Sequence, residues 1–170
     1  MRRVLRPMAI LREIWRAPPR GMALVEFGLA APILILLLVT VIDLGLAFYE
    51  ALQVQGAASA GAAYASLHAW EPTGVNITKV VQASTDLGNK VTVPLGYPNT
   101  SQICGCTVSG TMVENGALPA SGNCSAVTTC TGGAGVYAKV KVQMTYSTLI
   151  TYPGLPSPLT LTGTAYRRTQ

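Results

Sequence analysis

Apolar residues concentrate in one block near the N-terminus. Residues 27–42 carry no charge, and after the single Asp43 the apolar character continues to Tyr49. The stretch from Ala23 to Phe48 is 26 residues long. At a rise of about 1.5 Å per residue, about 20 residues are enough to span a bilayer. The block therefore predicts a transmembrane helix.

The residues that follow predict that this helix continues outward. Residues 49–67 are rich in alanine and other small residues and contain no proline, which favours one long helix. Gly56 and Ala60, like Ala57 and Gly61, place small residues four apart on one face, a spacing that lets helices approach closely. High helix propensity explains the same residues equally well.

Beyond the helix the pattern predicts a small α+β domain. Apolar residues recur at helical spacing over residues 75–87, and Gly88 marks the expected end of this second helix. Strict alternation over residues 136–146 predicts the clearest strand of the chain. A proline-rich turn at 151–158 then leads to residues 159–166, which we expect to return as its antiparallel partner.

Three weaker signals complete the expected domain. Val91 and Val93 alternate with polar residues and predict a first, short strand. The segments 103–108 and 125–131 are rich in Gly, Ser and Thr and are interpreted as loops or short edge strands. The predicted fold class is thus α+β, with a long N-terminal transmembrane helix leading into a domain with a second helix and an antiparallel β-sheet.

The charge of the chain lies almost entirely in its first 20 residues. They hold six arginines against a single glutamate, whereas the remaining 150 residues hold six basic and six acidic side chains. Positive residues before an apolar run stay in the cytoplasm, so everything after about Phe48 is expected to be exported. The neutral body has no basic face for phosphates, which argues against a nucleic-acid partner.

Release as a soluble exported protein is a weaker alternative. Small-x-small sites occur at residues 58–60 and 63–65, and cleavage there would leave a chain beginning near Ser66. Both sites lie ten or more residues beyond an apolar core that is longer than a secretory signal requires. The Arg2-Arg3 pair lies too far before the apolar run to act as a twin-arginine signal.

Four cysteines lie on the side expected to be exported, at positions Cys104, Cys106, Cys124 and Cys130. An even number in an oxidising compartment predicts two disulfides. Pairing Cys104 with Cys106 would strain the bridge, and the crossed and nested pairings both stay open. A zinc site is the rival, but structural zinc favours pairs separated by two to four residues, which this spacing does not match. No metal is expected.

The inventory of catalytic side chains is thin. His68 is the only histidine and lies beside Trp70, with no nearby residues that would complete a triad. Asp86 and Glu114 are isolated in the sequence and are interpreted as solvated. There is no nucleophile elbow and no phosphate-binding loop. We expect neither enzymatic activity nor a cofactor.

A single carboxylate, Glu26, opens the apolar block five residues after Gly21. In an ordinary anchor it would reach back to the lipid headgroups. A carboxylate at full membrane depth costs about 2.5 to 3.5 kcal/mol and is usually neutralised by a partner. Cleavage after Gly21 would create such a partner, the α-amino group of Met22, from the same chain or from a neighbour in a packed array.

Several motifs in the N-terminal third form one joint pattern. The pattern begins with a small residue followed by a possible cleavage site. A glutamate and an aromatic residue come after four intervening residues, and the apolar helix continues from there. The residues that carry the pattern are Gly21-Met22, Glu26-Phe27, the stretch Ala23-Leu-Val-Glu-Phe-Gly-Leu-Ala-Ala-Pro32, Asp43-Leu-Gly45, Phe48-Tyr49 and the alanine-rich Val54–Tyr64.

This pattern resembles the processing site of type IV prepilins. Over about residues 21–65 it resembles the TadE-like pseudopilins of the Tad (tight adherence, Flp) pilus system. The resemblance implies that prepilin peptidase removes a cytoplasmic leader, residues 1–21. It further implies a transmembrane and assembly helix over 22–70 and a disulfide-bonded periplasmic domain over 71–170.

The same resemblance implies a structural function in the bacterial inner membrane. Partners would be prepilin peptidase, other major and minor pilins, the inner-membrane pilus platform and the lipid bilayer, with Glu26 and Phe27 as assembly residues. Phe27 stands where some pilins of this system carry tyrosine, and the chain is far longer than the small major pilins, which favours a minor subunit. The alternative is a single-pass periplasmic binding module or adhesin that does not enter pili.

Overall fold

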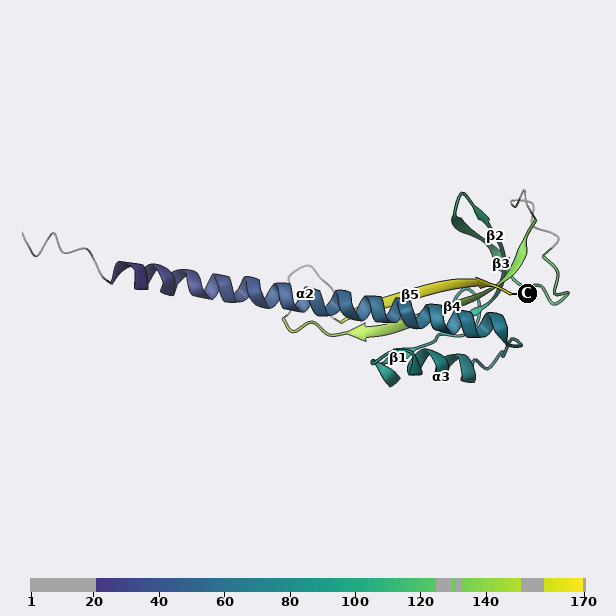
Figure 1. The fold of residues 1–170 in the computed structure, drawn as a ribbon, viewed down its shortest axis with the longest axis horizontal. Coiled ribbons are helices and arrows are strands. Elements are labelled where there is room, and N and C mark those ends of the chain that lie inside the picture. The colour runs from purple at the N-terminus through teal and green to yellow at the C-terminus, as the bar shows by residue number, and fades with distance from the viewer. Residues whose placement is uncertain (1–20, 125–129, 131–132, 151–157, 170) are drawn as a thin grey trace, which may run out of the picture. The chain divides into compact units, whose positions relative to one another are not determined.

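The computed structural model describes residues 21–124, 130, 133–150 and 158–169. The chain divides into two compact units, of which one ends at Ile42 and the other begins at Asp43. Helix α2, Met22–Leu67, provides the first unit and also the first element of the second (Figure 1). Its 46 residues confirm the expected long helix.

In the first unit α2 exposes large apolar side chains on all sides. Leu29, Ile35 and Leu37 are each more than half exposed. Pro32 lies inside the helix without ending it. The helix is long and apolar enough to cross a membrane, which makes it a candidate membrane anchor.

In the second unit α2 has one buried face made of small residues. Val54, Ala57, Ala58 and Ala62 are completely buried in the core of the domain. A Cβ on Gly61 would stand 2.6 Å from Val81 Cγ2, so a glycine is needed where α3 packs against α2. The spacing of Ala57 and Gly61 therefore serves packing inside this domain.

Helix α3, Val75–Ala83, is shorter than the sequence predicted. It ends at Ala83, and Gly88 begins a 3₁₀ turn, η1 Gly88–Lys90, so the expectation that Gly88 ends the helix is wrong. Polar side chains explain the difference, because Thr85 Oγ1 donates a hydrogen bond to Gln53 Oε1 on α2 at 2.5 Å. Such side-chain bonds compete with the helical pattern and end the helix early.

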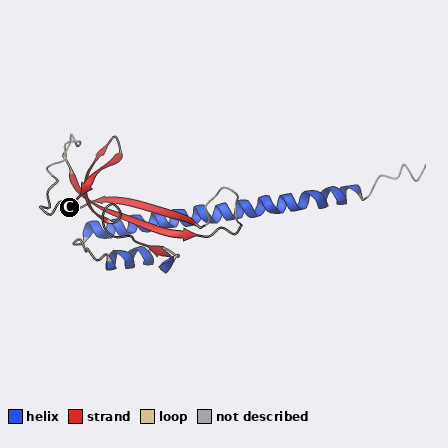
Figure 2. Ribbon diagram, turned by 180° about the vertical axis from the view of Figure 1, so that it is seen from behind, coloured by secondary structure: helices blue, strands red, loops and turns tan. Residues whose placement is uncertain are grey.

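The antiparallel sheet is built around one long strand, β4, Gly135–Tyr146 (Figure 2). Strand β5, Leu159–Arg168, pairs with one edge of β4 along its length, from Tyr137 opposite Arg168 to Tyr146 opposite Leu159. The other edge pairs with β1, Val91–Thr92, and with β2, Ser101–Val108. The strand that alternation predicted over residues 136–146 and its expected antiparallel partner over residues 159–166 are both confirmed.

The interpretation of residues 103–108 as a loop or a short edge strand is wrong. Strand β2 has eight residues and lies between β4 and β3, Thr111–Ala117, which the sequence did not indicate. Gly105 is required there, since a Cβ would stand 2.7 Å from the Val113 carbonyl oxygen. Strand β2 is held by backbone pairing on both edges and contains small residues. Its sequence therefore shows no alternation of apolar and polar side chains. Residues 125–129, 131 and 151–157, for which a loop or strand and a turn were predicted, lie outside the described residues.

Helix α2 also packs directly on β5. A Cβ on Gly163 would stand 2.7 Å from the Val54 carbonyl oxygen and 2.9 Å from Gln55 Cα. The Gln55 side chain receives a hydrogen bond from the Thr164 N–H at 3.1 Å and donates one to the Thr164 carbonyl at 3.0 Å. One amide side chain thus satisfies both backbone groups of Thr164 at the free edge of the strand.

Replacing Gly163 with alanine tests this backbone contact. The added methyl group meets helix backbone and not a flexible side chain, so we expect a loss of about 1–3 kcal/mol in unfolding free energy. The control is Gly56→Ala on α2, where no atom lies within 4 Å of the added Cβ. Thermal unfolding of the full chain in detergent micelles, followed by circular dichroism, measures both. If Gly163→Ala and the wild type have equal melting temperatures, the contact between Gly163 and α2 is not tight.

Candidate processing and assembly site

The junction proposed for cleavage lies at the start of α2. Gly21 precedes the helix, and its carbonyl accepts a hydrogen bond from the Val25 N–H at 3.3 Å, which makes Gly21 the N-cap. Gly21 is exposed, and no atom of another part of the chain lies within 4 Å of a Cβ built on it. The Gly21–Met22 peptide bond is therefore located where helical structure begins. Cleavage there stays a prediction.

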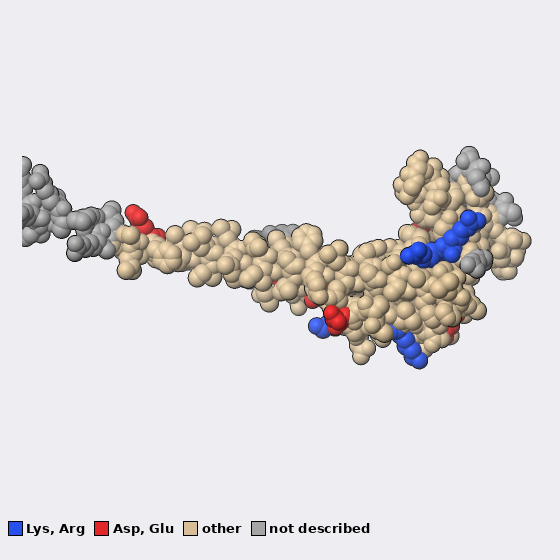
Figure 3. All heavy atoms as spheres, in the orientation of Figure 1, with Lys and Arg blue, Asp and Glu red and all other residues tan. Residues whose placement is uncertain are grey.

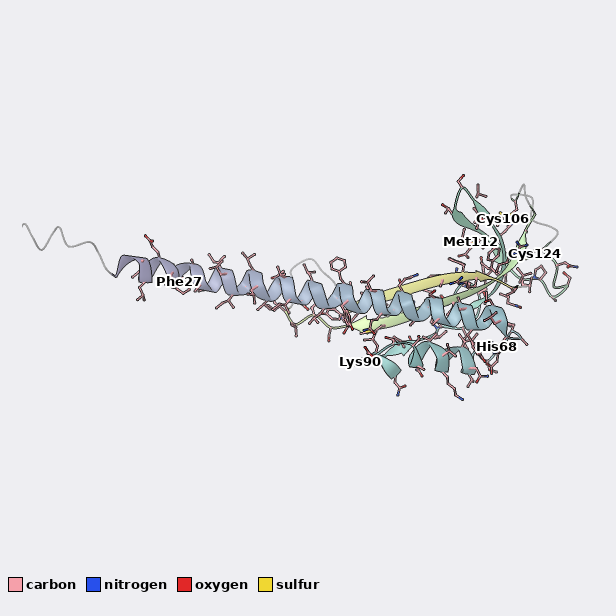
Figure 4. The ribbon with its side chains drawn as sticks, viewed as in Figure 1. Phe27, His68, Lys90, Cys106, Met112 and Cys124 are labelled. Carbon is pink, nitrogen blue, oxygen red and sulfur yellow. A yellow bond between two sulfur atoms is a disulfide. The ribbon has the colours of Figure 1, made fainter. Side chains whose placement is uncertain are left out.

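Glu26 and Phe27 both project from the first turns of α2. Phe27 is 67% exposed and points away from the helix axis (Figure 4). Glu26 is exposed, and its carboxylate has no hydrogen bond or ion pair among the described residues. Because residues four apart lie on one helical face, the Met22 backbone nitrogen and the Glu26 side chain are one turn apart. The carboxylate is thus open to a cation from outside the described residues.

The outer face of α2 stays apolar after the helix enters the second unit. Leu44, Leu46, Phe48, Tyr49 and Leu52 are between 46% and 72% exposed. Figure 3 shows the helix almost without charge along its visible length. Contiguous exposed apolar surface on this scale is typical of contact with a membrane or with another protein.

Asp43 is a buried carboxylate whose hydrogen-bond partners the sequence did not indicate. Its side chain is 1% exposed, although it lies in an otherwise apolar stretch. The Tyr146 hydroxyl donates to Asp43 Oδ1 at 2.5 Å, and the Leu149 N–H lies 3.3 and 3.2 Å from the two carboxylate oxygens. The lone acid was visible in the sequence as a signal. Its partners lie more than one hundred residues further along the chain, so the sequence did not indicate them.

The four cysteines form two disulfides, and the structure selects the crossed pairing. Cys104 bonds to Cys124 and Cys106 to Cys130. Cys104 and Cys106 lie two apart on β2 and therefore face the same side of the sheet. Figure 4 places Cys106 and Cys124 at the same end of the domain. The bridges tie β2 to the segment that leads into β4.

The interpretation of Glu114 as isolated and solvated is wrong. On β3, it accepts hydrogen bonds from Lys139 Nζ on β4 at 2.6 and 2.8 Å and from the Tyr166 hydroxyl on β5 at 2.5 Å. Lys139 Nζ also lies 5.6 Å from the centre of the Tyr166 ring. Three strands that are separate in sequence are thus joined by one ion pair and one phenol.

The contacts in this cluster shift the pKa values of Tyr166 and Glu114 in opposite directions. Burial raises the pKa of Tyr166, and the hydrogen bond to the Glu114 carboxylate raises it further, to about 12. Burial alone would raise the pKa of Glu114, but its bonds to Lys139 and Tyr166 outweigh burial, so the net pKa is lowered. The phenol is therefore protonated at neutral pH beside a paired carboxylate, and the three side chains link β3, β4 and β5.

His68 also has a packing function. Its ring stacks on Tyr64 with centroids 4.1 Å apart, and Nδ1 lies 3.0 Å from the Tyr64 carbonyl oxygen. Within the described part of the chain, no group of three or more His, Cys, Asp or Glu side chains is placed to hold a metal ion.

Comparison with known proteins points to the N-terminal part of the chain. The TadE-like protein family matches residues 21–63, a range that begins at the exposed glycine and includes most of α2. This confirms the resemblance to TadE-like pseudopilins, which are pilin-like proteins of Tad pilus systems and not a family of enzymes. No curated protein and no solved structure matches the chain.

The bond network of Asp43 can be tested with Tyr146→Phe, which removes one donor to a buried carboxylate. We expect unfolding free energy to fall by about 1–3 kcal/mol, because the buried carboxylate loses one of its hydrogen-bond donors and stays away from water. Tyr97→Phe is the matched control, since Tyr97 is 53% exposed. Melting temperatures of the full chains in micelles compare the two. If Tyr146→Phe melts with the wild type, the bond does not stabilise the domain.

Proposed function

We propose that this protein is a minor pilin of a Tad-like type IV pilus. The observation that carries the proposal is the coincidence of two ranges: the match to TadE-like proteins covers residues 21–63, and α2 runs over Met22–Leu67. The part of the chain with family character is therefore the junction and the helix by which pilins are processed and assembled. Most of the outer domain lies beyond the range that the family model matches.

The proposed layout follows from charge and hydropathy. Residues 1–21 form a cytoplasmic leader whose six arginines keep the N-terminus inside. Prepilin peptidase cleaves after Gly21, α2 within residues 22–70 anchors the product in the inner membrane, and residues 71–170 form most of the periplasmic domain. Support for the periplasmic side comes from the two disulfides, because such bonds persist in oxidising compartments.

Assembly on this proposal depends on the new amino terminus. Cleavage converts the Met22 nitrogen into a cation one helical turn from the exposed Glu26 carboxylate. In a packed bundle, the amine of one subunit pairs with Glu26 of its neighbour, which removes the cost of an unpaired carboxylate in the membrane, about 2.5 to 3.5 kcal/mol at full depth and less near the interface. Only one axial register between neighbouring helices satisfies that pair.

The exposed apolar face of α2 would then contact the other subunits. Gly56 is exposed on the helix surface and has open space around it, unlike Gly61, which is buried against its own domain. Small residues on an outer face let a second helix approach closely. As a minor subunit, the protein would initiate or cap the pilus on the inner-membrane platform, with major and minor pilins as its partners.

Processing is tested by the intact mass of the protein purified from cells that contain prepilin peptidase. The mature chain should begin at Met22, and Gly21→Leu should leave the leader attached, because a bulky residue before the cut blocks the peptidase. A second measurement in cells lacking the peptidase serves as the control and should show the full-length chain. An unprocessed wild-type N-terminus in peptidase-containing cells would end the pilin assignment.

The function of Glu26 is tested with Glu26→Ala. The variant should insert and be cleaved at Met22 but fail to appear in sheared pili, because the neighbour's amine has lost its partner. Glu26→Asp keeps the charge and should restore part of the incorporation. Wild-type amounts of Glu26→Ala in pili, measured by immunoblot, would show that the carboxylate does not set the register.

A further inference from the structure

An apolar tip lies beside Asp43, at the end of β4. Strand β4 ends at Tyr146, and the chain continues past Asp43, held there by the hydrogen bonds from Tyr146 and the Leu149 N–H. The side chains of Leu149 and Ile150 are 66% and 39% exposed. These five residues, 146–150, are called the β4 tip. They include no charged side chain.

The position of Asp43 along the helix sets the depth of the β4 tip. Residues 23–42, 20 in number, directly precede Asp43. At a rise of about 1.5 Å per residue they cover about 30 Å, the thickness of the hydrocarbon core. If α2 spans the bilayer as proposed above, Asp43 is located where the helix leaves the acyl chains. Leu149 lies at the same level because its backbone N–H is bonded to Asp43.

We infer that the β4 tip rests on the outer leaflet of the inner membrane, with Leu149 and Ile150 at the boundary between headgroups and acyl chains. The contacts of the β4 tip then have two functions. The tip shields the Asp43 carboxylate from lipid by giving it hydrogen bonds, and it places apolar side chains against the lipid next to the helix.

The chemistry of the surroundings favours lipid as the occupant of this surface. Leu44, Leu46 and Phe48, which follow Asp43 on α2, are also exposed, so the helix presents apolar side chains directly after the residue that binds the β4 tip. The Tyr146 ring is buried, at 7% exposure, so Leu149 and Ile150 are the apolar side chains that the β4 tip presents outward. The inference rests on the transmembrane function proposed for α2 and adds a second membrane contact, made by the outer domain.

Tryptophan quenching tests this contact in the full chain. Leu149→Trp is prepared in a background in which Trp15 and Trp70 are replaced by phenylalanine, and is reconstituted into vesicles that contain lipids brominated near the top of their acyl chains. We expect the emission to fall to roughly half of that in unbrominated vesicles, as for a residue at the hydrocarbon boundary. Circular dichroism confirms that the background variant is folded.

Two further tryptophans make the result decisive. Val108→Trp is the matched control, because Val108 is 46% exposed and lies beyond Gly135 at the other end of β4, about 36 Å away at 3.3 Å per residue. It should not be quenched. Leu36→Trp, on the exposed surface of α2 in the first unit, reports whether the helix is inserted.

The outcomes separate the two proposals. Quenching at positions 36 and 149 but not at 108 supports the inference. Quenching at position 36 alone overturns it and leaves the membrane anchor standing. Emission at position 149 that changes with protein density in the vesicles, without quenching by bromine, would assign the β4 tip to a second copy of the chain and would also overturn it. No quenching at either position 36 or position 149 would overturn the anchor as well.

Discussion

The close contact between α2 and the sheet is the constraint on which the domain depends. The helix lies so near β5 that only glycine fits at position 163, and so near α3 that only glycine fits at position 61. Small side chains such as Ala57, Ala58 and Ala62 fill the space between. Dense packing of this kind leaves little room for larger side chains, so the alanine-rich composition of α2 is a requirement of its own domain.

One helix therefore serves two environments through different faces. The face with Val54 and Ala57 is completely buried in the domain, whereas Phe48 and Leu52 on other faces are more than 70% exposed. A face that is committed to the domain is not available to a neighbouring subunit. Any assembly contact along residues 43–67 must use the exposed face, where Gly56 has no close neighbours.

Polar contacts at two levels hold the helix in register with the sheet. Asp43 binds the end of β4, and Gln55 binds the free edge of β5 through both atoms of its amide. Buried polar groups stabilise a fold only when their hydrogen-bonding capacity is used, and each of these bonds has a single matching position. The apolar contacts provide the area of the interface, and these bonds select one alignment within it.

The sequence by itself determined the elements whose signal is local. The long apolar block, the alternation over residues 136–146 and the glycine and glutamate at 21 and 26 are all patterns along a short stretch of chain, and they were enough to indicate the helix, the main strand pair and the TadE-like resemblance. Only the tertiary structure decided the crossed disulfides, the interior position of β2, the linking of Glu114 to Lys139 and Tyr166, and the partners of Asp43. These features depend on residues that are distant in sequence and become neighbours only when the strands pair and the helix packs on the sheet. No local periodicity along the chain indicates which distant residues will meet.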